Sequence, residues 1–245
     1  MPVSLLLLFG LAFIMGAGLV VMLVHAARGD RTRGQAPRQA LITQASFAHP
    51  GAPYFPRPAC WLALKTCNLL AVQAALGLHH PKPCSWAEGF ADEEKLFIAP
   101  PLKGWILVIG SRLPDPADDV DACFRFVLAL SHKLGEVQFF SASPILHHHA
   151  WVRAEHGRII RAYAWAGRTI WNQGPRTPAE KQLHLKCFEY ADPVQSTSFG
   201  QSEAIAVNVD KLPQLAARWS LDPAAIDEHF LYHEQGIAGE PSRRY

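Results

Sequence analysis

The sequence lacks most of the patterns that indicate a particular activity. Its five cysteines include no Cys-x-x-Cys pair, so neither a disulfide framework nor a zinc ribbon is expected. It contains no His-Glu-x-x-His, no Gly-x-Ser-x-Gly and no glycine loop that would bind phosphate, which leaves these enzyme classes without a signature. A formal net charge of +2, without a dense Lys/Arg stripe, argues against nucleic acid as a partner.

Charged residues are missing from the N-terminal segment. The run Val3–Val24 contains one hydroxyl, Ser4, and no ionisable side chain. A helix over these residues, at about 1.5 Å each, is roughly 33 Å long and crosses a hydrocarbon core of about 30 Å. We therefore expect a transmembrane helix over residues 3–25. A cleaved signal peptide is the alternative: Val24-His25-Ala26 resembles a cleavage site, although no basic residue precedes the apolar run.

Basic residues gather directly after the apolar run and predict its orientation. Only Asp30 opposes four arginines, Arg28, Arg31, Arg33 and Arg38. By the positive-inside tendency, the C-terminal part lies in the cytoplasm. Residues 26–53 are polar and rich in Gly and Pro, which is typical of a juxtamembrane linker. The expected localisation is the cell membrane, with one span and a cytoplasmic domain; signal cleavage would instead place the domain outside the membrane.

Residues 54–240 are expected to form one soluble α+β domain. The strands between 136 and 172 adjoin one another through two-residue turns such as His156-Gly157, which predicts an antiparallel β-meander covered by helices on one face. The other strands are expected over 96–99, 104–110 and 204–209. Helices are expected over 60–76, 115–135 with Asp115 as N-cap, 178–190 with a Thr177/Glu180 capping box, and 222–233.

Three consecutive histidines, His147 to His149, raise the question of a metal site or a catalytic base. On a strand His147 and His149 share one face while His148 lies on the other, so at most two of them can bind the same ion. Zinc needs three or four ligands, and none lies at a recognised spacing. His229 and His233 are spaced as a ligand pair on a helix, but such spacing also arises by chance. No metal and no cofactor are expected.

The second kind of catalytic group that the sequence offers is a cysteine nucleophile. Four cysteines fall in apolar helical patterns and are expected to be buried, namely Cys60, Cys67, Cys123 and Cys187. Cys84 lies in a predicted loop and is the one candidate nucleophile. His147 or His149, acting with a cysteine or a metal, would make the protein a membrane-tethered hydrolase. This is the alternative function.

Aromatic residues of the predicted meander suggest a binding surface. Tyr163 and Trp165 share one face of their strand, Trp151 and Trp171 lie on neighbouring strands, and Asn172 adds an amide. Such rings can bind a protein or ligand, although they can also be core. The principal hypothesis is therefore a single-pass membrane protein whose domain is a non-catalytic binding module, with a regulatory or immunity-like role toward a protein partner.

Overall fold

The computed structural model describes residues 58–91, 94–190, 199–226 and 228–241. All of them belong to the unit Pro53–Tyr245. The predicted transmembrane helix at 3–25 and linker at 26–53 lie outside the described residues and stay predictions. Among the helices in the described ranges, none combines the length and the hydropathy needed to cross a bilayer.

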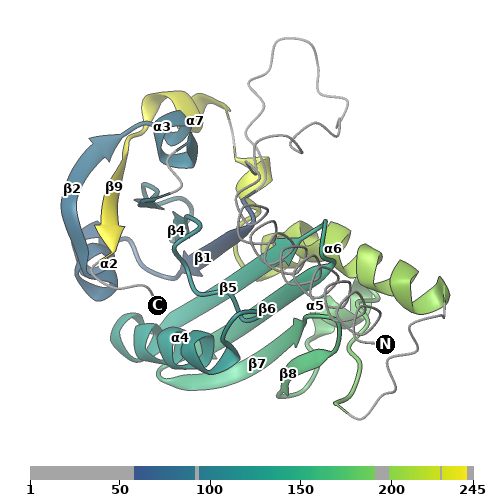
Figure 1. Cartoon of the computed structure of the whole chain (residues 1–245). Coiled ribbons are helices and arrows are strands. Elements are labelled where there is room, and N and C mark those ends of the chain that lie inside the picture. Colours follow the sequence, from purple (N-terminus) through teal and green to yellow (C-terminus); the bar gives the residue numbers. More distant parts are fainter. Residues whose placement is uncertain (1–57, 92–93, 191–198, 227, 242–245) are drawn as a thin grey trace, which may run out of the picture. The chain divides into compact units, whose positions relative to one another are not determined.

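An antiparallel sheet of nine strands organises the described residues (Figure 1). The spatial order is β2-β9-β3-β4-β1-β5-β6-β7-β8, so strands close in sequence are not always neighbours in the sheet. The prediction of an α+β domain is confirmed, and β5 to β8 form the predicted meander. The strands are β1 Cys60–Leu64, β2 Leu78–Cys84, β3 Leu96–Ile98, β4 Ile106–Ile109, β5 Glu136–Ser143, β6 His148–Glu155, β7 Arg158–Trp165, β8 Thr169–Gln173 and β9 Gly236–Pro241.

Helices cover both faces of the sheet, so the prediction of helices on one face is wrong. Residues of α2 and α4 pack on one face, and residues of α3, α6 and α7 pack on the other; α4 and α6 lie on opposite sides of β5 and β6 in Figure 1. The sequence of β1 explains why both faces are covered. Its neighbouring residues Trp61 and Leu62 point to opposite faces of the sheet, and both are fully buried. The helices are α2 Leu69–Leu76, α3 Trp86–Ala91, α4 Val120–Leu134, α5 Pro178–Gln182, α6 Phe199–Trp219 and α7 Glu228–His233.

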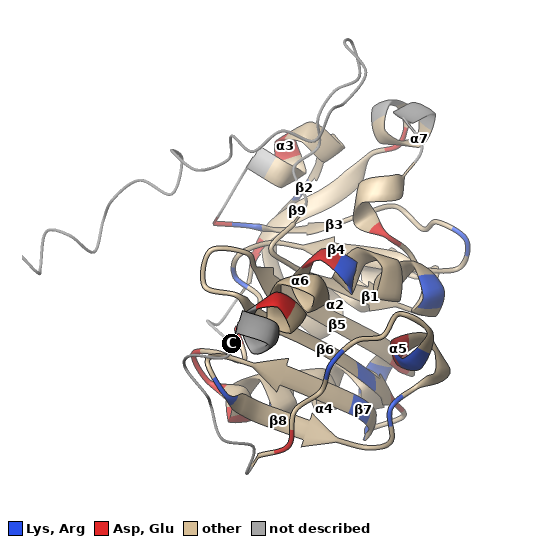
Figure 2. Cartoon of the chain, turned by 90° about the vertical axis from the view of Figure 1, so that its right-hand side faces the viewer, with Lys and Arg blue, Asp and Glu red and all other residues tan. Residues whose placement is uncertain are grey.

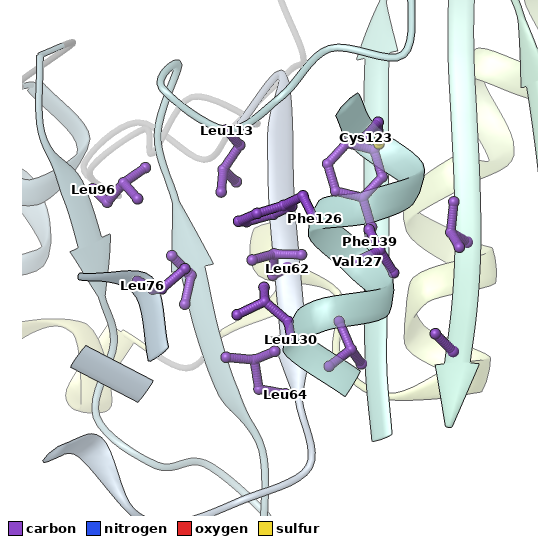
Figure 3. Close-up of a cluster of buried hydrophobic side chains, with 14 of the residues drawn as sticks. Leu62, Leu64, Leu76, Leu96, Leu113, Cys123, Phe126, Val127, Leu130 and Phe139 are labelled. Atoms are coloured by element: carbon purple, nitrogen blue, oxygen red, sulfur yellow. The ribbon is translucent and has the colours of Figure 1, made fainter. Parts of the chain in front are cut away.

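Each face of the sheet has its own apolar core. On one face, Phe126, Val127 and Leu130 of α4 pack over the β1 side chains Leu62 and Leu64 (Figure 3). On the opposite face, Trp61 and Phe140 stack with ring centroids 5.1 Å apart, within a cluster that includes leucines of α6. The two cores together leave the central strands without a solvent-facing side.

The helix predicted over 60–76 is wrong in its first half, because this stretch contains β1 and only then α2. Asn68 separates the two elements: its side-chain oxygen accepts a hydrogen bond from Ala71 N at 3.0 Å and caps α2. In β1 the apolar side chains lie on both faces of the strand, so the sequence shows a continuous apolar run. A short run of this kind cannot be told from the buried part of a helix by its periodicity.

Four further elements differ from the predictions. The helix expected over 222–233 is divided into a short 3-10 helix, Pro223–Ala225, and α7. The N-cap of α4 is Asp119, whose side chain accepts from Ala122 N at 2.8 Å, whereas Asp115 closes the preceding turn. The helix expected over 178–190 ends at Gln182 despite its confirmed capping box. The strand expected over 204–209 lies within α6.

Two strands were missed because their sequences resemble loops. β2 contains Pro81 and Pro83, which lack a backbone donor, and the strand tolerates them because it lies at the edge of the sheet with a register shift between His79 and Lys82. β9 begins at Gly236, where an added Cβ would lie 2.4 Å from the Ile98 carbonyl oxygen. β2 and β9 pair with each other although they lie near opposite ends of the described sequence.

Candidate functional site

The three consecutive histidines do not converge. His147 lies in an exposed turn with a φ of +53°, His148 is the half-buried first residue of β6, and His149 is 2% exposed on the face covered by α6. Within the described residues, no group of three or more His, Cys, Asp or Glu side chains is placed to hold a metal ion. This triplet therefore does not itself form a metal site.

His149 is part of a buried polar contact between β6 and α6. Its ring stacks on Trp151 with centroids 5.6 Å apart and planes 13° apart. Asn208 Nδ2 donates to His149 Nε2 at 3.1 Å, and His149 Nδ1 donates to the His147 carbonyl oxygen at 3.3 Å. Burial lowers the pKa of His149 to about 4, so the ring is neutral at physiological pH. This environment suits a structural group better than a general base, whose pKa lies near the working pH.

His149 should make the domain sensitive to mild acid. The folded-state pKa of about 4 lies below the ordinary value of about 6.5, so between these pH values only the unfolded chain binds the proton. The contribution is complete above pH 6.5 and is lost as the pH falls toward 4, lowering the free energy of unfolding by about 3 kcal/mol. Urea unfolding across this range measures the loss.

The control for this pH dependence is a pair of variants. His149→Asn cannot titrate and should unfold with a flatter pH profile, whereas alanine at the exposed His147 should keep the wild-type slope. Equal slopes for the wild type and His149→Asn would show that His149 is not the group responsible.

The candidate nucleophile Cys84 lies far from these histidines. It ends β2 and pairs with Gly236 of β9, so five strands separate it from β6 in the sheet order. With neighbouring strands about 4.8 Å apart, the separation far exceeds the hydrogen-bond distance, roughly 3 Å, that a nucleophile and its base require. The structure therefore does not bring Cys84 together with His147 or His149.

The other cysteines are placed differently. Cys123 is a buried residue of α4 and Cys60 of β1 is half-buried, whereas Cys67, expected to be buried, is exposed in the turn before α2. Burial raises the pKa of Cys60 well above its usual range and also raises that of Cys123. Burial is likewise the main reason that the pKa of Cys187 rises to about 11, against the opposing effect of Arg161. A thiol with a raised pKa is protonated at neutral pH and is therefore a poor nucleophile.

A fully buried ion pair joins β7 to α5 on the face of the sheet that α6 also covers. Arg161 of β7 and Glu180 of α5 are both 0% exposed, with Nε 2.8 Å from Oε1. Glu180 Oε1 also accepts from Trp151 Nε1 at 2.9 Å, and its Oε2 accepts from Thr177 N at 2.6 Å, completing the capping box. The remaining Arg161 donors bond to Asn172 Oδ1 and to nearby oxygen and sulfur acceptors, so the pair is densely hydrogen-bonded.

Residues 183–190, here named the strap, follow α5 and cross this buried network. The first three residues of the strap donate backbone hydrogen bonds to carbonyl oxygens of α5, and from Lys186 onward side chains hold the backbone. Asn208 accepts from Lys186 N at 2.9 Å and donates to Lys186 O at 2.7 Å. Phe188 N donates to the Tyr163 hydroxyl at 3.1 Å, and Thr169 Oγ1 donates to Phe188 O at 2.9 Å. The strap is therefore fixed by groups from α5, β7, β8 and α6.

The aromatic residues predicted to form a binding surface are buried and divided between the two faces. Trp151 and Tyr163 are 0% exposed with ring centroids 4.9 Å apart, and Trp165 packs on Phe188 of the strap. Trp171 lies on the opposite face, edge-on to a phenylalanine of α4. These rings do not form one exposed surface. Asn172 is half-buried, and its backbone N–H donates to the Tyr190 hydroxyl at 2.7 Å.

A surface hollow of about 180 Å³ lies over the start of the strap. Figure 2 shows ribbon segments coloured for Lys and Arg on α5 and along the adjacent chain. At the start of the strap, buried Leu183 and Leu185 alternate with exposed His184 and Lys186, within the range where the sequence predicts a helix over 178–190. The hollow is here named the basic pocket, and its lining residues are Arg176, Lys181, His184, Leu185 and Lys186.

Comparisons with known proteins add no family to this picture: no family model, no curated protein and no solved structure matches the chain. The fold and the site define an antiparallel α+β domain with a basic pocket at its surface. A function can therefore be proposed only from the residues of this domain.

Proposed function

We propose that the protein is a single-pass membrane protein whose α+β domain is a non-catalytic binding module. One observation carries the proposal. Buried polar side chains of the α6-covered face hold the strap: Arg161 and Glu180 contact Cys187 Sγ, and Asn208 bonds to the backbone of Lys186. The strap in turn presents the basic pocket at the surface. A rigid support beneath an exposed charged hollow suits binding, because groups held in place lose little entropy when a ligand arrives.

The sequence supports the membrane part of the proposal. The apolar run at 3–25 has the length of a bilayer span, and the arginines after it favour a cytoplasmic domain. The domain would then work at the inner membrane surface, joined to its anchor by residues 26–53. Both statements rest on the sequence pattern alone.

The alternative hydrolase requires a base, a nucleophile or a metal in one place. Cys84 and His149 lie on strands at opposite parts of the sheet, and His149 has its ring nitrogens occupied. These positions favour binding over catalysis by this set of residues.

Metal analysis of the full chain tests the proposal directly. We expect the protein, purified reduced in neutral detergent, to contain no stoichiometric transition metal and to melt at the same temperature with and without chelator. A stoichiometric metal, or a large melting shift on chelation, would favour the hydrolase.

Thiol reactivity extends this test to a metal-free hydrolase. Iodoacetamide at pH 7 should modify Cys84 no faster than the exposed Cys67, which serves as the internal control. Labelling of Cys84 that is much faster than labelling of Cys67 would identify an activated nucleophile and contradict the proposed function.

A further inference from the structure

The basic pocket concentrates positive charge around a small hollow. Arg176, Lys181 and Lys186 line it together with His184, and no carboxylate is among its lining residues in the described part of the chain. Within the same residues, none of these three cations makes an ion pair. Like charges held around one hollow repel each other, and an anion between them removes that repulsion.

The acidic residue adjacent to Lys181 is withdrawn from the pocket. Glu180 is fully buried, with Oε1 bonded to Arg161 and Trp151 and with Oε2 bonded to the backbone of Thr177. Its carboxylate is therefore already matched by the Arg161 guanidinium in the interior. The buried ion pair thus keeps the acid adjacent to Lys181 from neutralising the pocket.

Three backbone carbonyl oxygens at the start of the strap, which would repel an anion, accept hydrogen bonds from side chains. Lys211 Nζ donates to Leu183 O at 2.9 Å, the Arg176 guanidinium donates to Leu185 O, and Asn208 donates to Lys186 O. The same bonds fix the shape of the pocket before any ligand arrives. His184 is held at a φ of +52°, a conformation that a residue with a side chain adopts at a cost and that recurs at binding sites.

We propose that the basic pocket binds a phosphoryl group, carried either by a lipid headgroup or by a soluble phosphate compound. The inference rests on the proposed binding function and names the ligand class. Arginine and lysine are the side chains that bind phosphate through charge-assisted hydrogen bonds. The volume of about 180 Å³ is below the range of about 300–1,000 Å³ typical of pockets for drug-sized ligands, which suits a compact anion.

Lysine acetylation of the full chain tests the inference at the pocket itself. In neutral detergent, saturating pyrophosphate is the soluble probe. In nanodiscs, phosphatidylcholine with and without phosphatidylinositol 4,5-bisphosphate is the lipid probe. We expect at least one probe to slow acetylation of Lys181 and Lys186 severalfold, with Lys82 and Lys133 unchanged as internal controls. Protection by pyrophosphate identifies a soluble source, and protection only in phosphoinositide nanodiscs identifies a lipid headgroup.

A charge-matched pair of variants measures the specificity of the effect. For the probe that protects, Lys181→Gln with Lys186→Gln should weaken binding about tenfold or more, because two of the cations facing the anion are lost. Lys82→Gln with Lys133→Gln removes the same charge elsewhere and should leave the affinity within about twofold. Titration calorimetry in neutral detergent gives these affinities, with pyrophosphate as the soluble ligand and a short-chain, water-soluble phosphatidylinositol 4,5-bisphosphate as the lipid ligand.

The inference is overturned if neither probe protects Lys181 and Lys186, if the control lysines are protected equally, or if both double variants weaken binding equally. Such a result leaves the proposed function standing as long as the metal and thiol tests favour it. A metal or an activated Cys84, in contrast, contradicts the proposed function whatever the pocket binds.

Discussion

Replacing Glu180 with alanine should lower the free energy of unfolding by about 3–5 kcal/mol, the loss expected when one partner of a buried ion pair is removed. The change leaves Arg161 charged, fully buried and without its carboxylate 2.8 Å away. It also removes the acceptor for Trp151 Nε1 and for the capping-box N–H of Thr177. Urea unfolding at neutral pH measures the loss.

Two controls separate this effect from loss of an ordinary ion pair. Lys65→Ala breaks a surface pair with Glu136, in which the lysine side chain is 61% exposed, and should change stability by about 1 kcal/mol or less. Arg161→Met combined with Glu180→Leu removes both charges and should recover part of the loss. A loss below about 1 kcal/mol for Glu180→Ala would mean that the pair is solvated in solution.

Replacing Trp151 with alanine should lower the free energy of unfolding by about 3–5 kcal/mol, the range for deletion of a buried aromatic side chain. The ring is fully buried, packs on His149 and Tyr163, and donates to Glu180. The cavity left behind would lie directly under the contacts between β6 and α6. Urea unfolding again gives the value.

The matched variant is Trp151→Phe, which keeps most of the ring and removes only its N–H group. It should lose about 1–2 kcal/mol, because Glu180 still accepts from Arg161 and Thr177. A loss of less than about 1 kcal/mol for Trp151→Ala would agree with an exposed aromatic surface and would contradict the buried position described here.

Local signals in the sequence predicted the parts of the fold that depend on neighbouring residues. The hairpin between β6 and β7 follows from His156-Gly157, and both residues have the positive φ that this turn requires. The Thr177/Glu180 capping box is equally local. The same local logic predicts a helix where β1 lies, because apolar residues buried on both faces of a strand lose the alternation that identifies it.

The strap and the basic pocket could not be predicted in this way, because their partners are distant in sequence. Asn208 holds Lys186 from 22 residues away, and Tyr163 holds Phe188 from 25 residues away. Glu180 was recognisable as a helix cap, but its bond to Arg161 depends on the packing of α5 against β7. Buried Leu183 and Leu185 alternate with exposed His184 and Lys186, but Leu183 and His184 lie in a turn, so this alternation does not identify a strand.

Amide hydrogen exchange in the strap tests most directly the claim that buried side chains hold it in a fixed shape. In the full-length protein, the amides of Lys186 and Phe188 should exchange slowly, like those of the neighbouring strand β6, because Asn208 and Tyr163 accept their hydrogen bonds. Exchange of both amides at the rate of an open surface loop would contradict this claim, and with it the preformed basic pocket.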